Sequence, residues 1–244
     1  MLKTILLGIY LIVPVLLFSI LVFPYLLIAW LKLGKWADPY VKSLGAAYSR
    51  HLLWLGGGRV TVRGLENIPA RKDICFISNH QSYVDIPLIV GYIPRLTGFV
   101  AKSELFKVPF LRIWLKALGC VKLNRGSGRS AIAMISEGSK SIRDGHPLVM
   151  FPEGTRSKSP NMGPFKPGSL KIATRYGAVI VPLTVNGTFH MLEEYNRVRS
   201  AKIDLIVHPP IDTGKLSKEE LETLPEVLRE IIAGPFRNGL ITAE

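Results

Sequence analysis

Several short runs of this sequence are apolar at successive positions, and this pattern restricts the fold more than any other. The clearest runs are 73–78 (DICFIS), 147–154 (PLVMFPEG) and 178–187 (AVIVPLTVNG), and segments with helical spacing of apolar residues separate them. A strand that is apolar on both of its faces must be covered on both faces. Strands of this kind, separated by helices, predict an α/β fold with one mixed sheet flanked by helices.

The remaining elements follow from the same periodicities and from turn residues. We expect further strands at 59–64, 97–102, 119–124 and 201–209, and helices at 35–55, 85–93, 103–117, 129–143, 168–177 and 218–233. Pro182 lies inside a strand pattern, which indicates either an edge strand or a bulge near a ligand. The 244 residues divide into an N-terminal segment, 1–58, and one α/β domain, 59–244.

The N-terminal segment contains 28 consecutive residues without a charge, from Thr4 to Leu31. A helix needs about 20 apolar residues to cross the hydrocarbon core, whereas the apolar part of a cleaved signal peptide has about 7–15. The run therefore predicts a membrane-inserted helical segment rather than a buried core helix. Pro14 and Pro24 interrupt it, so one kinked span and a bent pair of shorter helices both remain open. Basic residues follow the run, which predicts that the rest of the chain faces the cytoplasm.

The chain is strongly basic, with a net charge of +13 from 31 lysines and arginines against 18 aspartates and glutamates. Eight of the basic residues lie within 95–129, which contains one acidic residue, Glu104. This charge indicates an anionic partner: a membrane surface, a phosphorylated substrate or nucleic acid. Nucleic acid ranks last, because no stacking platform or recognised nucleic-acid module accompanies the charge.

His80 and Asp85 lie in the segment NHQSYVD, 79–85, where an apolar strand ends. A carboxylate that holds one ring nitrogen of a histidine leaves the other nitrogen able to accept a proton. A spacing of five does not place two residues on one helix face. The pair meets only if His80 lies in the turn and Asp85 begins the next helix. Asp85 would equally suit a helix N-terminus beside an ordinary loop histidine, so the pair alone leaves both interpretations open.

The segment FPEGTRS, 151–157, follows another apolar strand. Glu153, Thr155 and Arg156 would project from the carboxyl end of that strand, where open α/β sheets bind ligands. Gly154 would let the backbone approach a ligand closely or form a turn. The planar fork of Arg156 suits a phosphate. A turn with a surface ion pair is the alternative.

Lys102 and Arg125 are further candidates for an anion site. Lys102 ends the strand 97–102, and Arg125 follows the strand 119–124. Both side chains would reach a phosphate or a nucleotide from a strand end, or both would belong to a solvated basic face.

Several familiar catalytic patterns do not occur in the sequence. It has no G-x-S-x-G, no G-x-x-x-x-G-K-[ST], and no H-E-x-x-H or C-x-x-C pattern for a metal site. Cys75 and Cys120 lie in apolar strands, which is typical of buried thiols. We therefore expect no metal and no cofactor. Because His80 has no enzymic nucleophile beside it, the simplest chemistry is that the substrate supplies the nucleophile, as a hydroxyl.

Four segments between residues 74 and 188 resemble, in order, the motifs of the glycerolipid acyltransferase family. NHQSYVD matches the N-H-x-x-x-x-D pattern (the HX4D motif), and FPEGTRS matches the E-G-T-R block. FVAKSELFKVPF with the later NR is similar to the second block, and VPLTVNGT to the fourth. Each motif alone is short, but the ordered set is specific. Arg112 departs from the pattern, because glycine is common there in relatives.

The resemblance, which is closest to bacterial members, implies that a fatty acyl group moves from acyl-CoA or acyl-carrier protein to the 2-hydroxyl of lysophosphatidic acid. Phosphatidic acid would form in phospholipid biosynthesis at the inner membrane. The roles that it implies are His80 as general base, Asp85 as its orienting carboxylate, Glu153, Gly154, Thr155 and Arg156 as ligands of the glycerol phosphate, and Lys102 and Arg125 as added positive charge. Two alternatives remain: a sibling enzyme that uses glycerol-3-phosphate or another lysolipid, and a non-catalytic membrane-anchored protein that binds anionic lipid.

Overall fold

The computed structural model describes residues 34–109, 111–123, 128–166 and 168–237. The uncharged run 4–31 and Arg125 lie outside these residues. No helix in the described part of the chain has the length and apolar character needed to cross a membrane.

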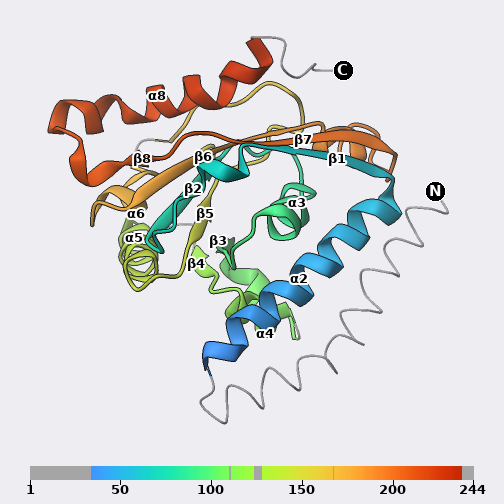
Figure 1. Cartoon of the computed structure of the whole chain (residues 1–244), viewed down its shortest axis with the longest axis horizontal. Coiled ribbons are helices and arrows are strands. Elements are labelled where there is room, and N and C mark those ends of the chain that lie inside the picture. The colour runs from blue at the N-terminus through green and yellow to red at the C-terminus, as the bar shows by residue number, and fades with distance from the viewer. Residues whose placement is uncertain (1–33, 110, 124–127, 167, 238–244) are drawn as a thin grey trace.

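Helices separate successive strands along the described chain, except β7 and β8, which follow one another directly (Figure 1). The strands are β1 (Gly58–Arg63), β2 (Ile74–Ser78), β3 (Gly98–Lys102), β4 (Val121–Leu123), β5 (Leu148–Met150), β6 (Val179–Asn186), β7 (Ala201–Val207) and β8 (Ile211–Asp212). The α-helices are α2 (Gly34–Gly56), α3 (Asp85–Tyr92), α4 (Leu111–Ala117), α5 (Gly128–Arg143), α6 (Lys171–Thr174), α7 (Thr188–Met191) and α8 (Lys218–Arg237). Three 3-10 helices are η1 (Leu65–Asn67), η2 (Ser103–Lys107) and η3 (Thr213–Lys215).

The predicted helix 103–117 is wrong as one element, because the structure divides it into η2 and α4. Pro109 disfavours the helical conformation of the residue before it, and Val108 is extended. The predicted strand 147–154 and helix 168–177 are also shorter than expected, at three and four residues. The residues that follow β5 form a loop instead, and this loop carries the E-G-T-R block.

The sheet has the strand order β1-β7-β6-β2-β5-β3-β4, and β8 pairs with β6. β2 is parallel to both β5 and β6, whereas β6 is antiparallel to β7. The predicted mixed sheet is therefore confirmed. Because β2, β5 and β6 run in one direction, their carboxyl ends meet at one edge of the sheet.

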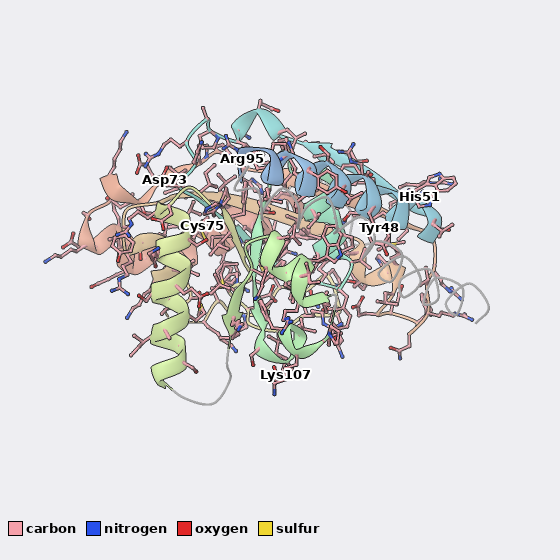
Figure 2. All side chains as sticks on the ribbon, turned by 90° about the horizontal axis from the view of Figure 1, so that it is seen from below. Tyr48, His51, Asp73, Cys75, Arg95 and Lys107 are labelled. Atoms are coloured by element: carbon pink, nitrogen blue, oxygen red, sulfur yellow. The ribbon has the colours of Figure 1, made fainter. Side chains whose placement is uncertain are left out.

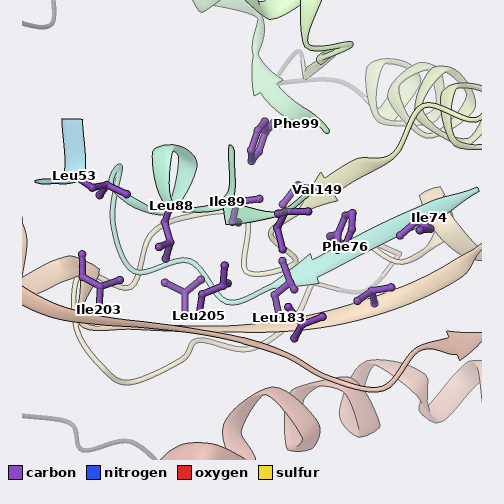
Figure 3. Packing of buried hydrophobic residues seen from close by; sticks show 14 of the residues in the cluster. Leu53, Ile74, Phe76, Leu88, Ile89, Phe99, Val149, Leu183, Ile203 and Leu205 are labelled. Carbon is purple, nitrogen blue, oxygen red and sulfur yellow. The ribbon is translucent and has the colours of Figure 1, made fainter. Parts of the chain in front are cut away.

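Alternate residues of β2 enter two different cores. Ile74 and Phe76 belong to the cluster that includes side chains of α2 and α3 (Figure 3). Cys75 and Ile77 belong to the cluster that includes side chains of α5, α6 and α8. All four are fully buried, which confirms that helices cover both faces of the sheet. Burial raises the pKa of the Cys75 thiol to about 12, so this thiol stays protonated at neutral pH.

Pro182 lies in β6, which has a neighbouring strand on each side, so the edge-strand interpretation is wrong. On one side of β6 the partner changes near this residue: β8 pairs with Val179 and Ile180, and β7 pairs from Leu183 onward. Proline has no backbone N–H to donate. At Pro182 neither β7 nor β8 pairs with β6, so no carbonyl of a neighbouring strand loses a donor there.

His208 and Thr184 connect this sheet to α8. Thr184 Oγ1 donates to the carbonyl of Ile232 at 2.7 Å, so its contact with His208 Nε2, also 2.7 Å, is one in which the imidazole donates. Leu224, Leu228 and Ile232, four residues apart along α8, are buried against the sheet.

We expect the stability of the protein to fall when the pH is lowered from about 7 to about 5. Burial lowers the pKa of His208 below its ordinary value of 6.5. Because the folded pKa is depressed, this stabilisation is present above pH 6.5 and is lost as the pH falls through the folded pKa. Urea unfolding in an uncharged detergent at both pH values measures the loss in the free energy of unfolding. His208→Gln should lack the part of this loss that comes from protonation of His208. An equal loss in both proteins would contradict the assignment.

Candidate active site

The carboxyl ends of β2, β5 and β6 lie side by side at one edge of the sheet (Figure 1). His80 follows β2, Glu153 and Arg156 follow β5, and Thr188 follows β6. The segments after β5 and β6, which lie 73 and 108 residues after His80 at Glu153 and Thr188, therefore meet the segment after β2 at this edge.

Asn79 determines how the chain leaves β2. Its Nδ2 donates to the carbonyl of Val185 and its Oδ1 accepts from the amide of Val185, both at 2.8 Å. The side-chain amide thus takes the place of one more backbone pair between β2 and β6. The main chain is free to turn away at this point, and the turn brings His80 above the sheet edge.

The structure brings His80 and Asp85 into contact. His80 Nδ1 lies 2.6 Å from Asp85 Oδ2, and the Asp85 side chain is fully buried. The same oxygen accepts the amides of Gln81 and Ser82 at 2.8 and 3.0 Å, and Oδ1 accepts the hydroxyl of Thr188 at 2.5 Å. The carboxylate has no proton of its own to donate, so His80 Nδ1 carries the hydrogen of the shared bond.

The other ring nitrogen of His80, Nε2, belongs to a side chain that is partly exposed. Because Nδ1 carries the proton, Nε2 holds a lone pair, and no hydrogen bond to Nε2 occurs within the described part of the chain. The ring stacks on Phe151 with centroids 4.0 Å apart, and the side chain is 16% exposed. The stacking and the bond to Asp85 fix the orientation of the imidazole ring. Nε2 is left able to accept a proton from an incoming hydroxyl.

Glu153 joins the loop after β5 to the loop after β2. Its Oε1 accepts the amide of His80 at 2.7 Å, and its Oε2 accepts the amide of Gly163 at 2.8 Å. Burial raises the pKa of this carboxyl. The amides of Ser157 and Lys158 donate to the carbonyls of His80 and Gln81. The two loops are therefore held together by side-chain and backbone bonds.

Arg156 is held in a defined orientation between Tyr83 and Glu193. Its Cζ is 3.4 Å from the centroid of the Tyr83 ring, and its Nη1 donates to Glu193 Oε1 at 2.8 Å. The side chain is 20% exposed. In the described chain Nη1 is the one guanidinium nitrogen of Arg156 with a protein hydrogen bond, so the remaining N–H groups are available to a ligand.

Gly154 combines a left-handed backbone with a close neighbour. Its φ is +68°, and an added Cβ would lie 2.7 Å from Lys166 Nζ. Lys166 is exposed and its amide donates to the carbonyl of Pro152. A second cation therefore lies over this loop. Thr155 is exposed beside it.

Lys102 lies at the carboxyl end of β3, which is the other neighbour of β5. Its side chain is 52% exposed and pairs with Glu104 at 3.3 Å. Among the described residues, no hydrogen bond or ion pair joins Lys102 to the His80 or Arg156 loops. Arg125 lies outside the described residues.

The site includes residues that the sequence motifs did not single out: Thr188, Lys166 and Glu193. Thr188 stands in the fourth block, which was a usable signal, but its partner Asp85 is 103 positions away. Glu193 follows α7, a helix of four residues that is too short to show a periodicity. No group of three or more histidine, cysteine, aspartate or glutamate residues in the described chain is arranged to hold a metal ion.

Comparison with known proteins identifies similar sequences and a similar structure. The acyltransferase family model matches residues 59–186. A 1-acyl-sn-glycerol-3-phosphate acyltransferase from Borreliella burgdorferi is 36% identical over 74% of this chain and 72% of its own length. A chloroplastic 1-acyl-sn-glycerol-3-phosphate acyltransferase, BAT2, from Brassica napus is 31% identical over 64% of this chain, but the match spans only 46% of that longer protein.

The structural match extends over almost the whole chain. The crystal structure of the 1-acyl-sn-glycerophosphate (LPA) acyltransferase PlsC from Thermotoga maritima superimposes with a TM-score of 0.79 at 26% identity. It covers 99% of this chain and 98% of the other.

Proposed function

Since the chain belongs to the acyltransferase family, we propose that it acylates the 2-hydroxyl of 1-acyl-glycerol-3-phosphate and produces phosphatidic acid. The acyl donor is a thioester, either acyl-CoA or acyl-carrier protein. One observation carries the proposal: the bare Nε2 of His80, backed by buried Asp85, lies at the same sheet edge as the guanidinium of Arg156. A group that accepts a proton, near a guanidinium that can bind phosphate, suits a substrate that carries both a hydroxyl and a phosphate.

The reaction needs one base and no enzymic nucleophile. His80 Nε2 takes the proton of the substrate hydroxyl as that oxygen attacks the thioester carbon. Asp85 holds Nδ1–H and stabilises the imidazolium that forms. The tetrahedral intermediate then collapses, the carbon–sulfur bond breaks, and the imidazolium returns the proton to the leaving thiolate. The products are an ester and a thiol, and no metal or further cofactor takes part.

The loop after β5 binds the phosphate in this proposal. Arg156 offers its unoccupied N–H groups, Thr155 its hydroxyl, and Gly154 its close backbone. Glu153 acts differently from the role that the resemblance implies: both of its oxygens accept backbone amides, so it positions the His80 loop. We assign Lys166 to the phosphate site beside Gly154. Lys102 and Arg125 add positive charge.

The proposed location is the cytoplasmic face of the inner membrane, with the N-terminal segment inserted in the bilayer. Five basic residues of the region 95–129 are exposed, namely Lys102, Lys107, Arg112, Lys116 and Lys122, and Lys107 extends outward from η2 (Figure 2). Each basic residue near an anionic surface contributes about 1 kcal/mol. This charge supports a position beside anionic lipid, where the acceptor's acyl chain stays in the membrane.

Two other functions make different predictions about the acceptor. A sibling enzyme would acylate glycerol-3-phosphate or another lysolipid. A non-catalytic lipid-binding protein would transfer nothing, and the enzymatic names of the relatives speak against it.

We expect purified protein to form phosphatidic acid from labelled palmitoyl thioesters and lysophosphatidic acid. Palmitoyl-CoA and the palmitoyl carrier protein are supplied separately, and the acceptors are lysophosphatidic acid, glycerol-3-phosphate and lysophosphatidylcholine. Lipid products are measured in detergent and in liposomes. Transfer only to lysophosphatidic acid supports the proposal, because that acceptor alone combines an acyl chain with a terminal phosphate. Preferred transfer to either other acceptor would reject the assignment of substrate.

A further inference from the structure

We propose that Glu193 is a positioning residue for Arg156, and that it sets the affinity of the site for the acceptor's phosphate. This inference rests on the proposed function, in which Arg156 binds that phosphate. It adds a residue outside the four motifs, 37 positions after Arg156 in the chain.

The side chain of Glu193, which follows the short helix α7, is buried. Its side chain is 6% exposed, and its backbone amide donates to the carbonyl of Phe189 at 2.9 Å. A buried carboxylate is costly unless it is paired. The partner of Glu193, Arg156, therefore indicates why a carboxylate occupies this buried position.

One oxygen of Glu193 holds two parts of the site. Oε1 accepts Arg156 Nη1 at 2.8 Å and the amide of Tyr83 at 3.0 Å. The Tyr83 ring in turn lies under the guanidinium, 3.4 Å from Cζ. Glu193 thus fixes Arg156 at one nitrogen and also fixes the backbone of the residue whose ring supports the guanidinium plane.

The second oxygen of Glu193 takes no part in the contact with Arg156, which is a single hydrogen bond. Oε2 is buried and has no hydrogen-bond partner in the described part of the chain. Pairs of arginine and carboxylate frequently form two parallel bonds. Here a single bond is made, and the other N–H groups of Arg156 stay open to a ligand. Such an unpaired buried oxygen needs an explanation, and holding Arg156 in a binding orientation supplies one.

Orientation, rather than charge, is what Glu193 contributes, because its negative charge opposes a phosphate. Glu193→Gln keeps an oxygen for Nη1 and for the Tyr83 amide, whereas Glu193→Ala removes both contacts. The Tyr83 amide is exposed, so water can replace the lost acceptor and the His80–Asp85 pair stays intact. The two variants therefore separate orientation from charge.

We expect Glu193→Ala to raise KM for lysophosphatidic acid by roughly 10-fold, the size of one lost charge-assisted hydrogen bond. The values of kcat and of KM for palmitoyl-CoA should change by less than about 3-fold, and Glu193→Gln should restore most of the affinity. Glu194→Ala is the matched control, because the neighbouring Glu194 pairs with His190 and is 34% exposed. This control should match the unaltered protein.

A double-mutant cycle tests whether the effect passes through Arg156. Arg156→Ala should raise KM for lysophosphatidic acid at least as much as Glu193→Ala. In the Arg156→Ala background, Glu193→Ala should then add less than about 2-fold. Additive effects, or equal effects on both substrates, would overturn the positioning role. If Arg156→Ala raises KM and Glu193→Ala does not, this inference alone fails. If Arg156→Ala leaves KM unchanged, the proposed phosphate ligand itself is wrong.

Discussion

Replacing His80 by alanine should lower kcat by about 10²–10⁴-fold, which is the usual contribution of a general base. The reason is geometric: Nε2 is the proposed proton acceptor, and the ring that carries it is fixed by Asp85 at 2.6 Å and by the face of Phe151. No other histidine stands at this sheet edge in the described chain with a buried carboxylate behind it. The KM for lysophosphatidic acid should change little, because the proposed phosphate ligands are Arg156 and its loop rather than His80.

Steady-state transfer from labelled palmitoyl-CoA measures this change. His190→Ala is the matched control, since His190 also pairs with a carboxylate, Glu194 at 2.7 Å, but both side chains are partly exposed. That variant should keep nearly full activity. Thermal unfolding of both variants separates lost chemistry from lost folding. A His80→Ala protein that is folded and retains more than about a tenth of kcat would refute the assignment of the base.

Replacing Asp85 by asparagine should be at least as damaging, with kcat lowered by about 10³–10⁴-fold, as happens when the carboxylate behind a catalytic histidine becomes an amide. Asp85 Oδ2 accepts three donors: His80 Nδ1 and the amides of Gln81 and Ser82. An asparagine NH₂ group cannot accept any of them. If it turns toward these donors, the imidazole adopts the wrong tautomer and the loop loses its anchor.

This substitution should also lower stability by about 1–3 kcal/mol, because buried donors lose their acceptor. Urea unfolding and kcat are measured on the same preparation of Asp85→Asn. Thr188→Val is a milder comparison, since it removes the 2.5 Å bond to Asp85 Oδ1 and a longer contact of 3.4 Å with Gln81 Oε1, and it leaves the bond to His80 unchanged. A folded Asp85→Asn protein with undiminished kcat would assign Asp85 to structure alone.

The sequence predicts the parts of the site that follow apolar strands. β5 is apolar at every position and β2 at all but its last, Ser78, and the ends of these strands give the places of His80 and Arg156. The sequence alone leaves open whether His80 and Asp85 contact each other or whether Asp85 only begins a helix beside a loop histidine. A spacing of five residues does not reveal whether a turn lies between them. The structure places Asp85 at the first position of α3, with its carboxylate directed back at the turn.

Other parts of the site depend on contacts that no local pattern encodes. Glu193 reaches Arg156 only because the chain folds back through α7 after β6, and four helical residues carry no periodic signal. Glu153 looks like a substrate ligand in the motif, but the burial of its carboxylate against the amides of His80 and Gly163 is a tertiary property. The break between η2 and α4 had a local signal in Pro109, and the apolar spacing across it was misleading.

Asn79 has a consequence for how such a site can diversify under selection. Its amide replaces a peptide group opposite Val185, and this needs a donor and an acceptor on a one-carbon stem. Aspartate has no donor and glutamine is one carbon longer. Asn79 is therefore required by the turn that carries His80, because its side chain pairs with β6 and not with a substrate. Residues around the proposed acceptor site can change under selection while the requirement at this position remains.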